Sequence, residues 1–281
     1  MNNHSNLHKI MQSLCCHPPS EHGDVKRIKR SRNMKFYRRW QPVAALTFDL
    51  DDTLYDNREV IVRAERRLRN WMEIHCNAIA SFDAAQWKMI RQQVISDNPR
   101  LVGFVTEIRR AQILLAASIC GLHTSNAKTL ADDAIEFFLF ERSNFSVSDQ
   151  TIETLSSLYS HYPLVAITNG NVDCDRLGLS PYFQRVIKAG SDGHPKPDLA
   201  LFDIAKNWLG LPTSEILHVG DHLQADVRGA KLAGFKACWF NDTHKPLMLQ
   251  QRASFLPDVE ISHLSQLLIL TYTFNPTSKL N

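Results

Sequence analysis

The sequence predicts an α/β protein in which a Rossmann-like core, built on a parallel sheet, carries a small helical unit inserted after the first strand. Two patterns predict this fold. Short apolar runs end at glycine or polar residues and are followed by helix-like sequence, which is typical of strands buried on both faces of a parallel sheet. The stretch after the first run instead has the spacing of amphipathic helices. A chain of 281 residues, 44% of them hydrophobic, can build one sizeable core and a smaller second unit.

Five apolar runs are the predicted core strands. In open parallel sheets ligands bind outside the carboxyl ends of the strands, so the polar residues that follow these runs are candidate site residues. A crossover helix is expected over residues 226–235, with Gly234 just after its C-terminus. A last strand and helix are expected over residues 257–270. The five runs are residues 43–48 (VAALTF), 164–168 (LVAIT), 185–190 (RVIKAG), 216–220 (ILHVG) and 236–240 (KACWF).

Residues 57–145 are predicted to form a helical insertion. Apolar side chains recur at helical spacing over residues 60–75, and the stretches around 86–95, 104–120 and 127–142 have helical patterns as well. The insertion is longer than a crossover between parallel strands requires, so we expect a small cap over the carboxyl edge of the sheet. Helices packed on the flank of the sheet are the alternative, because periodicity does not place a helix in space.

Charge is unevenly distributed along the chain, which has 32 Lys+Arg and 29 Asp+Glu. Residues 1–40 contain nine of the basic residues and only Glu21 and Asp24 as acids, so the remainder has a net charge of −4. We interpret this basic leader as a solvated, disordered segment; a peripheral electrostatic role and a targeting role are alternatives. The predicted organisation is a leader (1–40), a core (41–56 and 146–270), a helical cap (57–145) and a tail (271–281).

The composition also bounds the class of protein. No apolar run approaches the roughly 18 residues that a membrane-spanning helix needs, and no secretory signal follows the basic leader. The six cysteines show no CxxC or Cys/His spacing, which argues against a structural zinc site and fits reduced thiols. We therefore expect a soluble, cytoplasmic protein without a nucleic-acid or membrane partner.

A cluster of acids follows the first predicted strand. Ionised carboxylates that leave water cost several kcal/mol each unless positive charge compensates, so the cluster indicates a metal site or a catalytic site. An EF-hand loop starting at the first acid would need Gly at its sixth position and Glu at its twelfth, where this chain has Leu54 and Val60. Asp52 and Asp56 are interpreted as loop and helix-entry residues. The four acids, within the segment ALTFDLDDTLYDN, are Asp49, Asp51, Asp52 and Asp56.

A non-catalytic phosphate-binding module, which would keep the metal acids but need no Asp51, and a phosphoacceptor receiver module are the alternatives from a non-enzymatic class. A receiver module also pairs acids at strand ends with a later Thr and Lys. Its acid pair should precede the phosphorylated Asp on a separate strand, and it has no place for a helical insertion between residues 57 and 145.

Four motifs in order resemble the haloacid dehalogenase superfamily. Each motif alone is weak, but all four lie at predicted strand ends or in the loops that follow. The resemblance covers about residues 43–265, with the insertion at the position of the family's type 1 cap. Residues before Met34 have no counterpart in the family, so we expect them to be dispensable. The motifs are DLDDT at Asp49, LVAITNGN at Thr168, GHPKPD at Lys196, and GDHLQAD with Asp221 and Asp226.

The resemblance implies a magnesium-dependent reaction with a covalent intermediate. Asp49 is implied to be the nucleophile that becomes an aspartyl phosphate, while its other oxygen binds Mg²⁺. Asp221 is implied to be the second carboxylate ligand, and Asp51 to contribute its main-chain carbonyl. Asp226 is implied to lie behind these ligands. Mg²⁺ is suited to such a site because it prefers oxygen ligands and a few carboxylates.

The resemblance also implies how the phosphate would be bound. Thr168 would donate a hydrogen bond to a phosphoryl oxygen. Asn169 would help to shape the phosphate loop and to bind the substrate. Lys196 would neutralise the phosphate and orient Asp49. A phosphate dianion repels an attacking carboxylate, so such a site needs this positive charge.

Asp51 separates the reaction classes within the superfamily. Its side chain can protonate the leaving alkoxide and then take a proton from the hydrolytic water. The dehalogenase branch has no acid at this position, because a halide leaves without a proton. The resemblance therefore implies a phosphatase acting on a small phosphomonoester, with a sugar phosphomutase as a poorer match.

The likeness is closest to the bacterial flavin mononucleotide phosphatases, which also hydrolyse 5-amino-6-(5-phospho-D-ribitylamino)uracil, a riboflavin precursor. LTFDLDDTLYDNR, PLVAITNGN, EILHVGD and KACW carry this likeness. A broad-specificity sugar-phosphate or nucleotide phosphatase is the alternative. His222 departs from the family, whose members often have an acidic or small polar residue there. It is interpreted as a solvent-facing loop residue without a role, and a lower Mg²⁺ affinity or an added pH dependence is the alternative. His194 and His218 are interpreted as structural.

Overall fold

The computed structural model describes residues 34–250 and 254–274, and the basic segment before Met34 lies outside these ranges. A central sheet contains seven strands in the order β1-β7-β6-β5-β2-β3-β4, and only β1 runs antiparallel to its neighbour. The strands are β1 (Lys35–Phe36), β2 (Ala45–Phe48), β3 (Leu164–Thr168), β4 (Arg185–Lys188), β5 (Ile216–Gly220), β6 (Lys236–Phe240) and β7 (Val259–Ile261).

The predicted strands are confirmed. The five apolar runs form β2 to β6, and the segment 257–270 contains β7 and most of helix α11. Every residue of β2, β3 and β5 is buried, as expected for strands covered on both faces. The mostly parallel sheet with helices therefore agrees with the α/β fold class.

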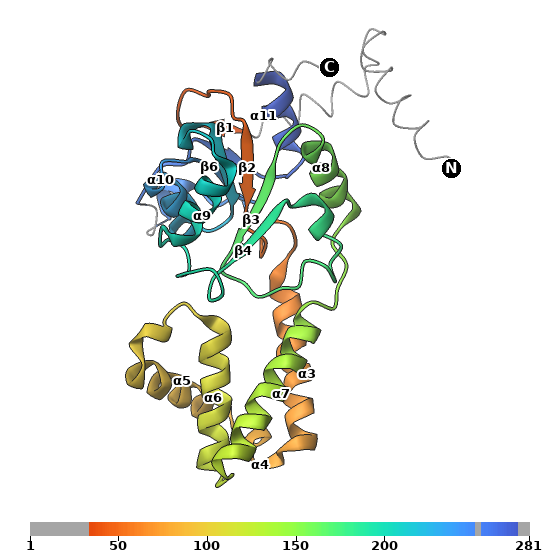
Figure 1. Cartoon of the computed structure of the whole chain (residues 1–281), viewed down its shortest axis with the longest axis vertical. Helices are drawn as coiled ribbons and strands as arrows, with labels where there is room; N and C mark the ends of the chain where they lie inside the picture. Colours follow the sequence, from red (N-terminus) through yellow and green to blue (C-terminus); the bar gives the residue numbers. More distant parts are fainter. Residues whose placement is uncertain (1–33, 251–253, 275–281) are drawn as a thin grey trace, which may run out of the picture. The chain divides into compact units, whose positions relative to one another are not determined.

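Helices cover both faces of the sheet (Figure 1). Helices α9 and α10 lie on one face, where the ring of Phe202 packs edge-on against Phe235 in an apolar cluster that includes Ile167. Helices α8 and α11 lie on the other face. Within the described ranges, no helix is long and apolar enough to cross a membrane. The bounds are α8 (Asp149–Tyr159), α9 (Ala200–Leu209), α10 (Gly229–Leu232) and α11 (Gln266–Phe274).

The strand order creates a switch point beside β2. From β2 the chain proceeds to β3 and β4 on one side, and it later returns to β5 and β6 on the other. In open parallel sheets the crevice at such a point, outside the carboxyl ends of the strands, is where ligands bind. The acid cluster after β2 and the Gly-Asp pair after β5 therefore lie at the same edge.

The crossover from β5 to β6 differs from the single helix predicted over residues 226–235. It begins with a wide π-helical turn, η4 (Leu223–Arg228), and only α10 is α-helical. The exposed ring of His222 caps the turn, because its Nδ1 accepts hydrogen bonds from the main-chain N–H groups of Gln224 and Ala225. Gly234 has a φ of 81°, which confirms its expected place after the helix end.

The residues after β2 form a group of helices that pack mainly on one another, α7 lying against both α3 and α6 (Figure 1). They share an apolar cluster in which Leu68, Ile113 and Phe138 are buried. This arrangement fits a cap better than helices on the sheet flank; the exact domain boundaries stay a prediction. We call these helices the helical cap: α3 (Asn57–His75), α4 (Asn77–Ala80), α5 (Ala84–Asp97), α6 (Val105–Ile119) and α7 (Thr124–Arg142).

The end of the predicted leader requires correction, because residues 35–36 belong to the sheet as β1. Lys35 donates a 2.8 Å hydrogen bond to Glu260 of β7, and the hydroxyl of Tyr37 donates to the same carboxylate. Glu260 is 4% exposed and needs such donors. A local charge count does not reveal this requirement, since the partner lies 225 positions away.

Candidate active site

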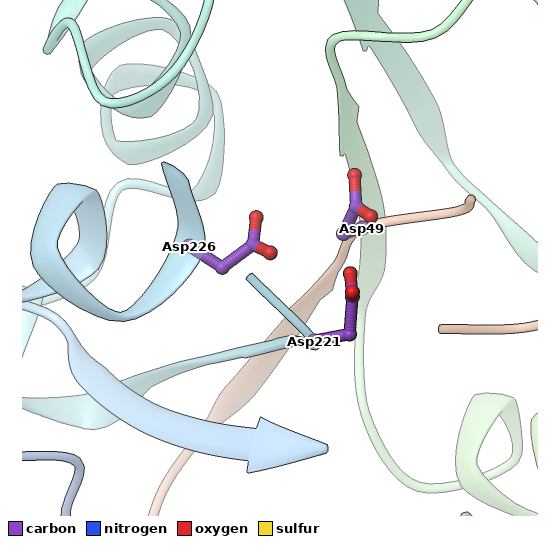
Figure 2. A group of neighbouring side chains, drawn as sticks. All are labelled: Asp49, Asp221 and Asp226. Atoms are coloured by element: carbon purple, nitrogen blue, oxygen red, sulfur yellow. The ribbon is translucent and has the colours of Figure 1, made fainter. Parts of the chain in front are cut away.

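Three carboxylates converge at the carboxyl edge of the sheet. Asp49 directly follows β2, Asp221 directly follows β5, and Asp226 comes from the π-helical turn. Figure 2 shows the three side chains close together, with the carboxylate of Asp226 facing the other two residues. One oxygen of each lies within 4.8 Å of the others. The sequence-predicted acids at positions 49, 221 and 226 are therefore brought together, and the group could hold a metal ion.

Lys196 supplies a positive charge at this cluster. Its Nζ donates hydrogen bonds to Asp49 Oδ1 at 2.7 Å, to Asp226 Oδ1 at 2.6 Å and to the carbonyl oxygen of Ile167 at 2.6 Å. These three acceptors use all the ammonium protons. Burial by itself would lower the pKa of Lys196, but the charges of Asp226 and Asp49 outweigh it and raise the pKa. The side chain therefore stays cationic.

One lysine does not balance three acids. Burial is the main cause that raises the pKa of Asp49 to about 7, despite the attraction of Lys196. The pKa of Asp221 rises to about 8, mainly through burial and then through the charges of Asp226 and Asp49. No lysine or arginine in the described part of the chain forms an ion pair with Asp221. Asp221 thus lacks a cationic partner, and Asp49 shares its lysine with Asp226. Hard oxygen donors of this kind suit a divalent cation.

Asp226 is held by the protein itself. Besides Lys196, its Oδ1 lies 3.2 Å from Nε2 of His218, and its Oδ2 accepts from the main-chain N–H of His222 at 2.9 Å. Burial opposes ionisation of Asp226, but Lys196 and His218 outweigh it and lower its pKa. Asp226 is therefore satisfied without a metal, and its direct role is to hold Lys196.

His218, interpreted from the sequence as structural, supports the site through two hydrogen bonds. Its Nδ1 lies 2.8 Å from the hydroxyl of Thr47 on the neighbouring strand. Burial lowers the pKa of His218, so the neutral ring is favoured. The Thr47 hydroxyl then donates to Nδ1, and the Nε2–H donates to Asp226. The strand pairing between β2 and β5 thereby supports the acid that holds Lys196.

Asp51 has a separate set of partners. Its Oδ1 accepts a 2.6 Å hydrogen bond from the hydroxyl of Tyr55 and another from Nη2 of Arg142, the last residue of α7. Its Oδ2 faces Gly170, where an added Cβ would lie only 2.3 Å away. Any side chain at position 170 would collide with Asp51. The acid therefore lies against the turn after β3, beside Thr168.

The turn after β3 arranges the other predicted residues. The hydroxyl of Thr168 accepts from the N–H of Gly170 at 2.9 Å. The Asn169 side chain accepts from the N–H of Lys196 at 2.7 Å and donates to its carbonyl at 2.9 Å. Asn171 donates to the hydroxyl of Thr106 in the cap at 2.8 Å. Asn169 therefore positions the Lys196 loop, a role that the sequence does not indicate.

Asp52 and Asp56 do not belong to the group of converging carboxylates, as expected from the sequence. Asp52 Oδ1 accepts from the N–H of Asn57, and Asp56 caps α3 by accepting from the N–H of Arg58. Thr53, from the same segment, accepts from the N–H of Asp221 at 3.2 Å and links the first motif to the last.

Four residues at the site were missed by sequence reasoning. Tyr55 lies four positions after Asp51, so only its proximity could have suggested it. The other three reach the site through tertiary contacts, and Arg142 is 91 positions from its partner. The four residues are Thr47, Tyr55, Arg142 and His218.

Comparisons with known proteins agree with this geometry. A family model for haloacid dehalogenase-like hydrolases matches residues 43–234. The 5-amino-6-(5-phospho-D-ribitylamino)uracil phosphatase of Escherichia coli strain K12 is 41% identical over 234 residues, which cover 83% of this chain and 98% of that protein. A glyceraldehyde 3-phosphate phosphatase of Methanopyrus kandleri is 27% identical over 80% of this chain and 96% of its own length. The crystal structure of a 2-haloacid dehalogenase from Pseudomonas syringae matches with a TM-score of 0.77 and 34% identity, covering 83% of this chain and 99% of that one.

Proposed function

We propose a mechanism for this chain, which belongs to the haloacid dehalogenase-like hydrolase family and is a phosphatase of that family. Asp49 is the nucleophile, Asp51 is the general acid and base, and Mg²⁺ is the cofactor. The observation that carries the proposal is the buried contact of 2.7 Å between Lys196 Nζ and Asp49 Oδ1, beside two further converging carboxylates.

In the first step, an oxygen of Asp49 attacks the phosphorus of a phosphomonoester. The bond between phosphorus and the ester oxygen breaks, and Asp51 gives its proton to the leaving oxygen, so an alcohol departs. In the second step, Asp51 takes a proton from a water molecule that attacks the aspartyl phosphate. The bond between phosphorus and the Asp49 oxygen breaks, which releases inorganic phosphate and restores the Asp49 carboxylate and the protonated Asp51.

Asp49 and Asp221 are the residues that would hold the metal, together with the main-chain carbonyl of Asp51. Both side chains have a pKa raised well above the ordinary value because they are buried without enough positive charge, so the donor set fits a hard divalent cation. When bound, Mg²⁺ supplies positive charge for the phosphoryl oxygens. Asp226 supports the site through Lys196 instead of binding the ion.

The phosphoryl group would be bound by the turn after β3, beside the positive charge of Lys196. The Lys196 ammonium offsets the repulsion between the phosphate dianion and Asp49. The Thr168 hydroxyl can donate to a phosphoryl oxygen while it accepts from Gly170. Asn169 contributes by holding the Lys196 backbone and by its position in the turn.

The likeness to a haloacid dehalogenase structure raises a second candidate reaction within the family. Asp51 favours the phosphatase reaction. An alkoxide leaving group needs a proton, whereas a halide does not. Asp51 lies two residues after the nucleophile, and its Oδ2 faces Gly170 in the turn after β3. A dehalogenase would have no use for this acid.

The proposed substrates are flavin mononucleotide and 5-amino-6-(5-phospho-D-ribitylamino)uracil, which places the enzyme in riboflavin biosynthesis. The 41% identity with the Escherichia coli phosphatase named for the second compound supports this choice. Relatives named as pyrimidine 5′-nucleotidase and glyceraldehyde 3-phosphate phosphatase support a broader sugar-phosphate or nucleotide specificity as the alternative. A cytoplasmic location, expected from the cysteines, stays a prediction.

The test is a phosphate-release assay on a panel of both flavin-related compounds, sugar phosphates and nucleotides, with Mg²⁺ present or chelated. We expect Mg²⁺-dependent release that is lost in Asp49→Asn and strongly reduced in Asp51→Asn. Asp52→Asn is the matched control, because the Asp52 carboxylate accepts from Asn57 at the start of α3. No Mg²⁺-dependent release from any compound would refute the proposed reaction. Release from sugar phosphates alone would refute only the substrate assignment.

A further inference from the structure

We propose that Arg142 is a positioning residue that, together with Tyr55, orients the side chain of Asp51 for proton transfer to the leaving group. The inference rests on the proposed phosphatase reaction, in which Asp51 is the acid. It assigns the guanidinium of a cap helix to the proton-transfer step rather than to phosphate binding or to folding alone.

Two donors meet on one oxygen of Asp51. Nη2 of Arg142 and the hydroxyl of Tyr55 both donate to Oδ1, the latter at 2.6 Å. A carboxylate that receives two donors on one oxygen cannot rotate freely about its Cβ–Cγ bond. Its other oxygen, Oδ2, is thereby directed at Gly170 in the turn beside Thr168, where the substrate phosphate is proposed to bind. The hydrogen bonds from Arg142 and Tyr55 to Oδ1 thus leave Oδ2 as the atom that faces the leaving group.

The hydroxyl of Tyr55 is suited to act as a permanent hydrogen-bond donor to Asp51. Burial and the neighbouring charge of Asp51 raise the pKa of Tyr55 well above its ordinary value, so the phenol keeps its proton. Its ring packs edge-on against Phe145 with the centroids 4.8 Å apart. The direction of the hydroxyl is therefore set by packing as well as by the hydrogen bond.

Arg142 directs its charge to Asp51. Its side chain is 1% exposed, and Asp51 is the carboxylate with which it forms an ion pair. Nη1 is buried and has no hydrogen-bond partner among the residues that the structure describes. A buried guanidinium is costly unless it is paired. The side chain is thus held by the catalytic acid rather than by a surrounding network of carboxylates.

The position of Arg142 is set by its neighbours at the end of α7. The preceding residue, Glu141, accepts two hydrogen bonds of 2.9 and 2.8 Å from Arg67 of α3. The following residue, Ser143, accepts from the N–H of Asp173, in the segment after β3, at 2.9 Å. The end of α7 is therefore tied to another cap helix on one side and to the core on the other.

The leaving group distinguishes a positioning role from a purely structural one. An alkyl phosphate releases an alkoxide that needs a proton, whereas 4-nitrophenyl phosphate releases a stable phenolate that needs little help. Loss of correct Asp51 orientation should slow leaving-group release from the first substrate much more than from the second. General acid catalysis typically contributes about 10²- to 10⁴-fold.

The experiment measures first-turnover release of the leaving alcohol by rapid quench, with Mg²⁺ present. The substrates are 4-nitrophenyl phosphate and whichever alkyl phosphate of the panel the wild type hydrolyses best. In Arg142→Met we expect release from the alkyl phosphate to fall by about 100-fold and from the aryl phosphate by less than about 10-fold. Arg142→Lys should recover part of the loss, and Tyr55→Phe should show the same selectivity with a smaller effect.

Arg109→Met is the matched control, because it removes a cap ion pair with Glu65 that involves neither Asp51 nor residues 141–143. It should leave the ratio of alkyl to aryl rates unchanged. An equal fall for both substrates in a folded Arg142→Met protein, or the same change of ratio in Arg109→Met, would overturn the inference. If Arg142→Met does not fold, the ratio in Arg142→Lys and Tyr55→Phe decides in the same way. Absence of activity in the wild type would instead refute the proposed function.

Discussion

The carboxyl edge of the sheet and the helical cap bury different kinds of side chain. At the sheet edge, Asp49, Lys196 and Asp226 are 7%, 4% and 2% exposed. The Lys196 ammonium donates hydrogen bonds to both acids. The interior of the cap is apolar, while an ion pair such as Arg109 with Glu65 lies nearer its surface, with these side chains 23% and 48% exposed. Buried charge is costly, so its concentration at one edge indicates chemistry, whereas the cap interior indicates folding and shape.

The two acids proposed to be catalytic illustrate the same difference. Asp49 receives its positive charge from Lys196 in the core, and Asp51, two residues later, receives it from Arg142 in the cap. The comparison therefore predicts that core substitutions at the site abolish chemistry, that cap-interior substitutions reduce stability, and that Arg142 belongs with the first group despite its position.

The largest effect is expected for Asp49→Asn. An amide is a poor nucleophile, so turnover should fall by at least about 10⁴-fold, measured as Mg²⁺-dependent phosphate release. The fold should persist, because the substitution removes one of the crowded carboxylates. Thermal unfolding by circular dichroism is the control. Measurable turnover by Asp49→Asn, after exclusion of deamidation by mass spectrometry, would contradict the role of the core cluster.

Lys196→Met should reduce both activity and stability. It leaves Asp49 and Asp226 buried without their shared cation, and breaking such a contact costs about 3–5 kcal/mol in the free energy of unfolding. Urea denaturation measures this change. Arg110→Met is the control, because Arg110 pairs with Asp132 in the cap, where these side chains are 37% and 44% exposed, and its loss should cost about 1 kcal/mol or less. Equal losses would show that the core charges have no special weight.

Phe138→Ala should separate stability from catalysis. Phe138 is 2% exposed in the apolar cluster of the cap, and truncation of a buried Phe costs about 3–5 kcal/mol. The rate constant kcat of the protein that remains folded should change little at low temperature. Phe138→Leu, which removes less volume, should lose less stability. A large fall in kcat without a loss of stability would break the comparison between cap and core.

Added Mg²⁺ should stabilise the protein more at pH 8 than at pH 5. The folded-state pKa of Asp49 is about 7 and that of Asp221 about 8, against the ordinary 3.8, so the folded protein retains protons that the unfolded chain loses. The contribution of these acids to stability without metal therefore falls as pH rises from about 4 to about 8. At 100 times the dissociation constant, Mg²⁺ should add about 3 kcal/mol. The increase in melting temperature on addition of Mg²⁺ measures this stabilisation. The increase should be smaller in Asp221→Asn.

The smallest effect is expected for Glu65→Gln at the cap surface. Its ion pair with Arg109, at 2.6 Å, is partly solvated, and such pairs contribute about 0.2–1 kcal/mol. The change in melting temperature should be small and should diminish further in 0.5 M salt, while phosphate release stays at the wild-type rate. A destabilisation comparable with that of Phe138→Ala would mean that charge, and not apolar packing, holds the cap together.

The sequence was informative wherever a short segment has a single explanation. Strand-length apolar runs bounded by proline, glycine or polar residues, such as residues 164–168 and 216–220, favour buried strands, and the helical periodicity of the cap repeats over several turns. The acids that follow these strands could be assigned to one edge, because the carboxyl ends of parallel strands meet there. The turn roles of Asp52 and Asp56 followed from the same local reasoning.

Contacts between distant segments were beyond that reasoning. Nothing near Arg142 in the chain indicates that its guanidinium lies against Asp51, and nothing near Thr47 indicates a hydrogen bond to His218. Periodicity and spacing report how a segment presents its own side chains, whereas these pairings depend on how strands align and where the end of α7 returns to the core. The sequence alone thus determined the fold class and the acids of the site, and its family resemblance assigned Lys196 to Asp49. Only the tertiary structure decided that Arg142 is the cation at Asp51, because that pairing is made by packing across 91 positions.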